Sequence, residues 1–189
     1  MGKKPLSEIQ VKSLRKLVAG NSLHELLLNL SVDLMLRGSD LLNLKVSDVM
    51  NESGTVKSEV KVKQKKTKKN TLLLPLSEKS INAIKIHLDG RPQEDFIFKG
   101  QKSHYTNKPI SVIQYSRIVK KWMEMLGVED TLAFSSHSMR KTKATVIYNK
   151  TKNIDAVRRL LGQSSVTATS AYIGVTDNSA LELARNINV

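Results

Sequence analysis

The chain of 189 residues contains no cysteine, which excludes disulfide bonds, zinc sites with thiolate ligands and thiol nucleophiles. It also lacks a secretory signal, because the N-terminal MGKKPLSEIQ is charged and has no apolar segment. No uninterrupted apolar run approaches the roughly 18 residues that a membrane-spanning helix needs. We therefore expect a cytoplasmic protein with no membrane association.

Acidic residues are scarce relative to basic ones, with 17 Asp and Glu against 31 Lys and Arg and a formal net charge of +14. A soluble chain with this excess of positive charge favours a polyanionic partner, most often nucleic acid. The alternatives are a solvated basic surface or an RNA- or ribosome-binding protein. Double-stranded DNA is the partner that the motifs described below favour.

Internal repeats, low-complexity tracts and long linkers are also missing, so residues 1–189 are expected to form one domain. Hydrophobic residues make up 40% of the sequence, which is enough for a core. The fold class that the pattern predicts is α+β, mostly helical with a small antiparallel β-sheet. Apolar periodicity and capping residues predict helices over about 7–20, 22–36, 39–44, 77–87, 111–126, 137–149, 153–161, 165–173 and 177–187.

The apolar period changes to two between residues 55 and 75, which predicts a β-hairpin with strands over about 55–64 and 71–75. A third short strand is predicted over 96–98. The tip of the hairpin is rich in lysine: Lys61, Lys63, Lys65, Lys66, Lys68 and Lys69. Such a tip can lie along DNA and contact its phosphates. The alternative is an ordinary solvated turn with no ligand. The net charge favours DNA.

Arg37 follows the apolar run 22–36 directly, at the junction with a turn. A buried guanidinium without a partner is costly, so Arg37 needs either an acidic neighbour or a bound anion. Spacing alone leaves both open, since Asp40 and Asp48 are close in sequence. Trp122 lies on the apolar face of the helix predicted over 111–126, so we expect it in the core rather than stacked on a base.

Five motifs occur in order: MLRGSDL (35–41) around Arg37, QKKTK (64–68) ahead of Leu74-Pro75, His137-x-x-Arg140, Leu161-Gly162, and Tyr172 ten residues after Gly162. Together they resemble the tyrosine recombinases, or phage integrase family, over nearly the whole chain. Any single motif occurs by chance, whereas the ordered set is specific. The resemblance implies the catalytic domain of a site-specific DNA recombinase or integrase.

The resemblance also implies roles for the residues that match. Arg37 and Arg140 would bind the scissile phosphate through planar, bidentate contacts that lysine cannot make. Tyr172 would attack phosphorus and form a 3′-phosphotyrosyl intermediate, and Lys66 would protonate the leaving oxygen. His137 would hydrogen-bond the phosphate or assist with the tyrosine proton. No cofactor or metal is implied, because cations of the chain itself would neutralise the phosphate.

Some positions depart from the family pattern. In the first motif, Met and Asp replace the family's glycine and glutamate, and the hairpin is one residue longer, which keeps Lys65 and Lys68 as candidates for the general acid. Gln163 stands where the family has histidine or tryptophan; its amide can hydrogen-bond a phosphate but cannot titrate. Lys141 replaces a frequent second histidine and is a further candidate for DNA contact.

These departures keep two alternatives open: a cleavage-deficient DNA-binding relative that acts as a regulator, and a type IB topoisomerase-like enzyme. The N-terminal core-binding domain that most family members use to clamp DNA is expected to be absent. The sequence would then be a catalytic fragment or a short natural form. We expect a monomer in solution and a homo-oligomer on DNA, a tetramer by analogy. The helix predicted over 177–187 would either dock on a neighbour or pack on its own domain.

Overall fold

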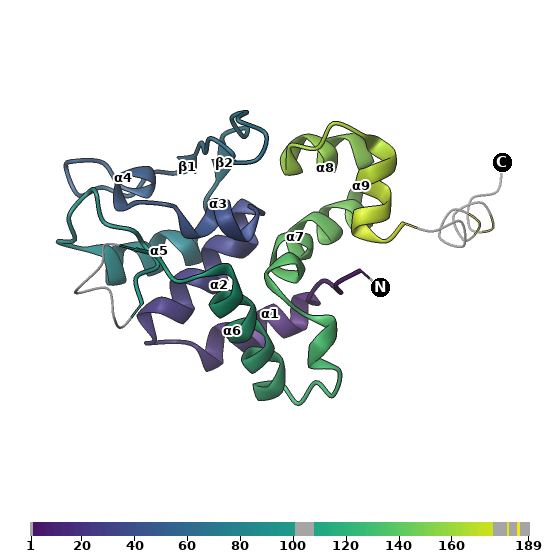
Figure 1. The fold of residues 1–189 in the computed structure, drawn as a ribbon, viewed down its shortest axis with the longest axis horizontal. Helices are drawn as coiled ribbons and strands as arrows, with labels where there is room; N and C mark the ends of the chain where they lie inside the picture. Colours follow the sequence, from purple (N-terminus) through teal and green to yellow (C-terminus); the bar gives the residue numbers. More distant parts are fainter. Residues whose placement is uncertain (1, 101–107, 176–180, 182–184, 186–189) are drawn as a thin grey trace.

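The computed structural model describes residues 2–100, 108–175, 181 and 185, and its architecture is shown in Figure 1. Helices predominate, and the only sheet among the described residues is a two-stranded antiparallel one, so the predicted α+β class is confirmed. The predicted helix over 177–187 lies almost wholly outside the described residues. The elements are α1 (Glu8–Leu17), α2 (Ser22–Leu34), α3 (Gly38–Leu42), α4 (Val46–Val49), β1 (Glu59–Val60), β2 (Leu74–Pro75), α5 (Glu78–Leu88), α6 (Val112–Met125), η1 (Thr131–Ala133), α7 (Ser136–Thr151), α8 (Ile154–Leu161) and α9 (Val166–Ile173).

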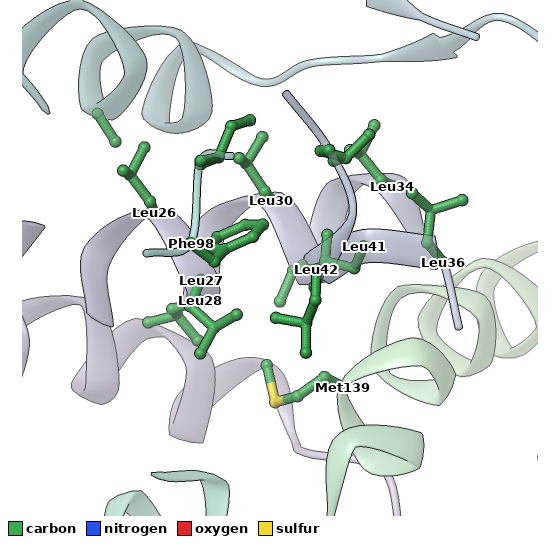
Figure 2. Packing of buried hydrophobic residues seen from close by; sticks show 14 of the residues in the cluster. Leu26, Leu27, Leu28, Leu30, Leu34, Leu36, Leu41, Leu42, Phe98 and Met139 are labelled. Atoms are coloured by element: carbon green, nitrogen blue, oxygen red, sulfur yellow. The ribbon is translucent and has the colours of Figure 1, made fainter. Parts of the chain in front are cut away.

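Helix α2 is the centre of the main core, as its apolar sequence predicts, because every residue from Leu26 to Leu34 is buried. Its leucines pack with Phe98 and with Met139 of α7 (Figure 2). Trp122 of α6 is fully buried, so its predicted place in the core is confirmed. Within the described residues, no helix combines the length and the apolar character that crossing a membrane requires.

Asp33, near the end of α2, is a buried acid that connects three helices. Its Oδ2 accepts hydrogen bonds from the Ser77 backbone N–H at 2.8 Å and from the Ser77 and Ser80 hydroxyls at 2.6 Å each, at the first turn of α5. Its Oδ1 lies 3.6 Å from Nζ of Lys143 on α7. These contacts satisfy a carboxylate that would otherwise be costly to bury, and they fix α7 against α2.

The sheet is shorter than the sequence predicts. Strands β1 and β2 pair only Glu59 with Pro75 and Val60 with Leu74. The ladder is interrupted because the N–H of Val62 donates to the Thr71 hydroxyl at 3.0 Å instead of to a backbone carbonyl. An isolated bridge between Lys63 and Asn70 then continues the hairpin toward its tip.

The third predicted strand, over 96–98, is wrong. Phe96 forms a single antiparallel bridge with Lys45, and Ile97 donates to the Leu44 carbonyl. Pairing cannot extend further because Lys45 is the N-cap of α4, where the chain turns into a helix.

A second, smaller core holds α8 and α9 against α7. It consists of Ala144, Val157, Leu161 and Ile173, together with Met35 from the end of α2. In Figure 1, α8 and α9 lie beside α7, on the far side of the molecule from α4 and α5. The segment that carries Tyr172 thus rests on a small separate core rather than on the main one.

Candidate active site

Arg37 lies where α2 gives way to α3. Met35 ends α2 in the left-handed conformation, with φ of +49°, and Arg37 is the N-cap of α3, which begins at Gly38 rather than at the predicted Ser39. The Arg37 Nη1 donates to Oε1 of Gln64 at 3.0 Å and lies 4.0 Å from Oδ2 of Asp40. The acidic neighbour is therefore Asp40, at the outer limit of an ion pair.

Asp48, the other candidate partner of Arg37, has a different role. It accepts a hydrogen bond from the N–H of Lys45 at 2.8 Å, at the start of α4. The Arg37 side chain keeps 24% of its surface exposed, so it has a neutral partner, a distant acid and room for an anion.

Arg140 lies one turn into α7, which is capped by the Ser135 side chain. The residue is 3% exposed, and its Nη2 donates to the Leu161 carbonyl at 2.6 Å. Its Nη1 is buried without a partner among the described residues. The pKa of Arg140 is lowered to about 10, chiefly by burial and also by the charge of Arg37, while Tyr172 and Asp40 act in the opposite direction. Arg140 is thus a desolvated cation whose Nη1 still needs a hydrogen-bond acceptor.

Tyr172 is positioned by the turn between α8 and α9. Gly162 ends α8 with φ of +62°, and its N–H and that of Gln163 donate to the carbonyls of Arg159 and Arg158. The Tyr172 hydroxyl is buried and has no hydrogen-bond partner among the described residues. Burial raises the pKa of Tyr172, and Arg140 and Arg37 partly oppose that rise. At neutral pH the side chain is a protonated phenol.

Unsatisfied buried polar atoms are concentrated at this site. Among the described residues, six buried side-chain atoms have no hydrogen-bond partner, and four of them belong to Asp40, Arg140, Gln163 and Tyr172. Such groups are rare in native proteins, and each calls for an explanation such as an unoccupied ligand position. Two of the four, Nη1 of Arg140 and the Tyr172 hydroxyl, can donate, and Arg37 adds a second guanidinium whose charge acts on both residues, so these donors fit an anion with several oxygens.

His137 and Lys141 lie on the same helix as Arg140. His137 is exposed, and its pKa is lowered by partial burial and by the cations Arg140, Lys141 and Arg37. Its imidazole is therefore neutral at pH 7 and can accept a proton. Lys141 is 8% exposed, and its Nζ lies 4.8 Å from the centroid of the Tyr172 ring. Lys141 is thus beside the tyrosine rather than on the outer basic surface.

The six lysines of the hairpin are all exposed, as a phosphate-binding surface requires. The base of the hairpin is tied to α3, because the N–H of Lys65 donates to Oδ1 of Asp40 at 2.9 Å. Within the described residues, the Lys66 side chain makes no hydrogen bond or ion pair. Its role as general acid therefore remains a prediction, as does the choice between Lys66 and its neighbours Lys65 and Lys68.

Sequence reasoning missed Gln64 as a part of the site. Gln64 is 2% exposed and contacts Arg37 directly. One signal was available: the alternation Val60, Val62, Gln64 places the amide on the inward face of the hairpin. A buried amide in that register needs polar partners, but the sequence does not say which ones.

Metal ligands are not gathered anywhere in ranges 2–100 and 108–175. No group of three or more His, Asp or Glu side chains there could hold a metal ion.

Comparison with known proteins shows the family of this chain and solved structures with the same fold. The family model described as "Phage integrase family" matches residues 5–179. The probable integrase/recombinase YoeC of Bacillus subtilis (strain 168) is 33% identical over 144 residues, which cover 76% of this chain and 73% of YoeC.

Two solved structures share the fold at 20% sequence identity. One is the XerA recombinase, with a TM-score of 0.74 over 98% of this chain and 65% of that one. The other is the XerH site-specific recombinase bound to a palindromic difH substrate in a post-cleavage complex, with a TM-score of 0.71 over 99% of this chain and 54% of that one. The chain thus spans between about half and three quarters of the length of these proteins.

Proposed function

Since the chain belongs to the phage integrase family, we propose that it cuts and rejoins double-stranded DNA as the catalytic domain of a site-specific tyrosine recombinase. The observation that carries this proposal is the pair of buried, unpartnered groups, Nη1 of Arg140 and the hydroxyl of Tyr172, in the charge field of Arg37. A backbone phosphate would give Arg140 its missing acceptor. It would also bring phosphorus to the Tyr172 hydroxyl.

The phosphate is bound by guanidinium groups. Arg140 would donate its free Nη1 to one non-bridging oxygen, and Arg37 would donate from the nitrogens that Gln64 leaves free. In a site with little water, such contacts stabilise the negative charge that develops on the phosphoryl oxygens in the transition state. Both cations are held by the protein before DNA binds, so little reorganisation is needed during the reaction.

Cleavage then follows as an in-line displacement. The Tyr172 oxygen attacks phosphorus, its proton passes to an acceptor for which neutral His137 is the best candidate, and the bond from phosphorus to the 5′-oxygen breaks. The departing oxygen takes a proton from a hairpin lysine, with Lys66 as the first choice. The product is a 3′-phosphotyrosyl bond and a free 5′-hydroxyl, and attack by a 5′-hydroxyl on that bond reverses the step and rejoins a strand.

DNA binding outside the cleavage site would use the exposed hairpin lysines. Each phosphate contact contributes affinity that falls as salt rises. XerH was solved on its DNA substrate, which supports DNA as the partner of this chain. Strand exchange between two duplexes requires several active sites, so we propose a homo-oligomer on DNA, with a tetramer as the expected form.

The test uses duplexes taken from the DNA that flanks the gene, each nicked near the cut so that the broken strand is lost. We expect an SDS-resistant protein–DNA adduct with the wild type and none with Tyr172→Phe. An adduct with Tyr172→Phe would refute the assignment of the nucleophile.

Gln163 supports one competing function, because its amide cannot titrate as the histidine that the family generally has at this position can. Specific, salt-sensitive binding to one duplex without any adduct would therefore favour a cleavage-deficient DNA-binding regulator. Relaxation of supercoils without sequence preference would favour a topoisomerase.

A further inference from the structure

Gln64 closes the loop that carries the hairpin lysines. Its N–H donates to the Lys69 carbonyl and its carbonyl accepts from the N–H of Lys68, both at 2.9 Å. The residue is 2% exposed. Its backbone is therefore fixed within the hairpin, and its side chain extends into the protein rather than into solvent.

The side-chain oxygen of Gln64 has two hydrogen-bond donors. Nη1 of Arg37 donates to Oε1 at 3.0 Å and the Thr67 hydroxyl donates to the same atom at 2.8 Å. Both lone pairs of the oxygen are thus used. Among the described residues, the only other charged contact of the Arg37 guanidinium is Asp40 at 4.0 Å, so Gln64 is the near partner that sets its orientation.

The same amide lies against the turn between α8 and α9. A Cβ atom built on Gly162 would lie 2.8 Å from Nε2 of Gln64, closer than real Cβ atoms come to a neighbour, and 3.3 Å from Oε1, which is also tight. Glycine at 162 permits this approach and adopts the φ of +62° without strain. The residue before it, Leu161, accepts the hydrogen bond from Arg140. Gln64 therefore joins Arg37, the hairpin and the turn that leads to Tyr172.

The chemistry of an amide suits this position better than the alternatives. An apolar side chain would leave Nη1 of Arg37 without its near acceptor, and a buried unpaired donor is costly. A carboxylate would accept the same hydrogen bond but would neutralise the positive charge that a phosphate needs. A neutral acceptor orients the guanidinium and leaves its charge intact.

We propose that Gln64 is a positioning residue for DNA cleavage: it fixes the Arg37 guanidinium and couples it to the lysine hairpin and to the Leu161–Gly162 turn. The inference rests on the proposed function, because Arg37 acts on a phosphate only if the chain binds one. Gln64 itself touches no reacting atom in this scheme.

The test compares Gln64→Leu with Thr67→Val, which removes the second donor to the same oxygen and leaves Arg37 in contact with Gln64. With Gln64→Leu we expect the single-turnover rate of adduct formation to fall at least tenfold, while the affinity for the duplex stays within about threefold of the wild type. Thr67→Val should stay within about threefold in both. An unchanged rate in Gln64→Leu would overturn the proposal, and so would equal losses of rate and affinity.

A second readout does not depend on catalysis. In ¹⁵N spectra of the free protein, with the Arg37 signals assigned through Arg37→Lys, the wild-type guanidinium should show restricted rotation about Nε–Cζ. Gln64→Leu should lose that restriction and Thr67→Val should keep it, and identical spectra in all three would overturn the proposal. If wild type gave no adduct, the proposed function would fail, and these spectra would still decide whether Gln64 orients Arg37.

Discussion

The side-chain amine of Lys141 lies over the ring of Tyr172, with its Nζ 4.8 Å from the ring centroid. A cation at this distance is attracted by the face of the ring. Because Lys141 follows Arg140 on α7, consecutive residues act on different parts of the tyrosine: one on its ring and the other on its hydroxyl. Lys141 thus contacts the face of the ring, and Arg140 acts on the hydroxyl that is to react.

The first prediction concerns the pKa of His137, which partial burial and then the charges of Arg140, Lys141 and Arg37 hold below 6.5. Lys141→Gln removes one of these cations, so we expect the His137 pKa to rise toward 6.5. An NMR titration of the imidazole in both proteins measures the shift. Lys143→Gln is the matched control, because Lys143 lies on the same helix but pairs with Asp33. An equal rise of the His137 pKa in Lys143→Gln would show that the rise does not depend on the neighbouring charge of Lys141.

The same pKa fixes the sign of one pH effect on stability. Folded His137 binds a proton less readily than the unfolded chain does, so its contribution to stability is present above about pH 6.5 and is lost as the pH falls through that value. We expect the decline in the free energy of unfolding below pH 6.5 to be shallower in Lys141→Gln than in the wild type. A steeper decline in the variant would contradict this reading.

The second prediction is that Arg140 lowers stability in exchange for function. Its pKa of about 10 instead of 12.5 means that the site as a whole, chiefly through burial, disfavours the charged form by about 3 kcal/mol. Arg140→Met should therefore raise the free energy of unfolding by about 1–3 kcal/mol in urea titrations, after the loss of the hydrogen bond to Leu161. The same variant should form no DNA adduct.

The control for this experiment is Arg159→Met. Arg159 has 68% of its side chain exposed and pairs with Asp155 on the surface, so its removal should change stability by less than about 0.5 kcal/mol. Inorganic phosphate should stabilise the wild type more than Arg140→Met, because only the wild type offers the free Nη1. A variant of Arg140 that unfolds more easily than the wild type would contradict the prediction.

Much of the fold was predictable because local signals agree with it. The capping box at Ser7 lies at the start of the first predicted helix, the helices predicted from 77 and 111 are capped by Ser77 and Ser111, and the apolar run after Ser22 is the buried centre. The extent of the sheet was not predictable. Alternation shows which side chains point inward, but not that the Thr71 hydroxyl takes the N–H of Val62 from the ladder.

The candidate site likewise has residues that the sequence predicts and one that it does not. Arg37, Arg140 and Tyr172 could be proposed from motifs because each carries its chemistry in its residue type. Gln64 could not, since its role depends on lying near Arg37 and Gly162 in space, far from both in sequence. Local patterns carry no information on such long-range packing.

The third prediction uses the turn of the hairpin, where Lys68 has a φ of +58°. A side chain in this left-handed region is strained by about 1–2 kcal/mol relative to glycine. Lys68→Gly should raise the free energy of unfolding by up to about 1 kcal/mol, because the added freedom of the unfolded chain offsets part of the gain. Lys69→Gly removes the same charge at a position outside the left-handed region and should be destabilising.

DNA binding by these two variants should weaken to the same degree. Each loses one exposed lysine of the hairpin, so each should reduce the slope of log affinity against log salt by about 1. A loss of stability in Lys68→Gly would contradict the assigned strain. A salt slope unchanged in both would show that neither lysine lies on phosphate.

The last prediction concerns Met35, which ends α2 with a φ of +49° and inserts its side chain, 2% exposed, into the small core beneath α8 and α9. The family pattern has glycine here. Met35 introduces backbone strain at this positive φ, and its side chain fills the small core, which glycine could not do. Met35→Ala should cost about 2–4 kcal/mol, and amide hydrogen exchange should accelerate in α8 and α9 while α2 and α5 stay protected. Met50→Ala, a deletion in the main core, should instead accelerate exchange in α2 and α5 as well. Equal acceleration throughout the chain in Met35→Ala would mean that the segment bearing Tyr172 does not unfold separately.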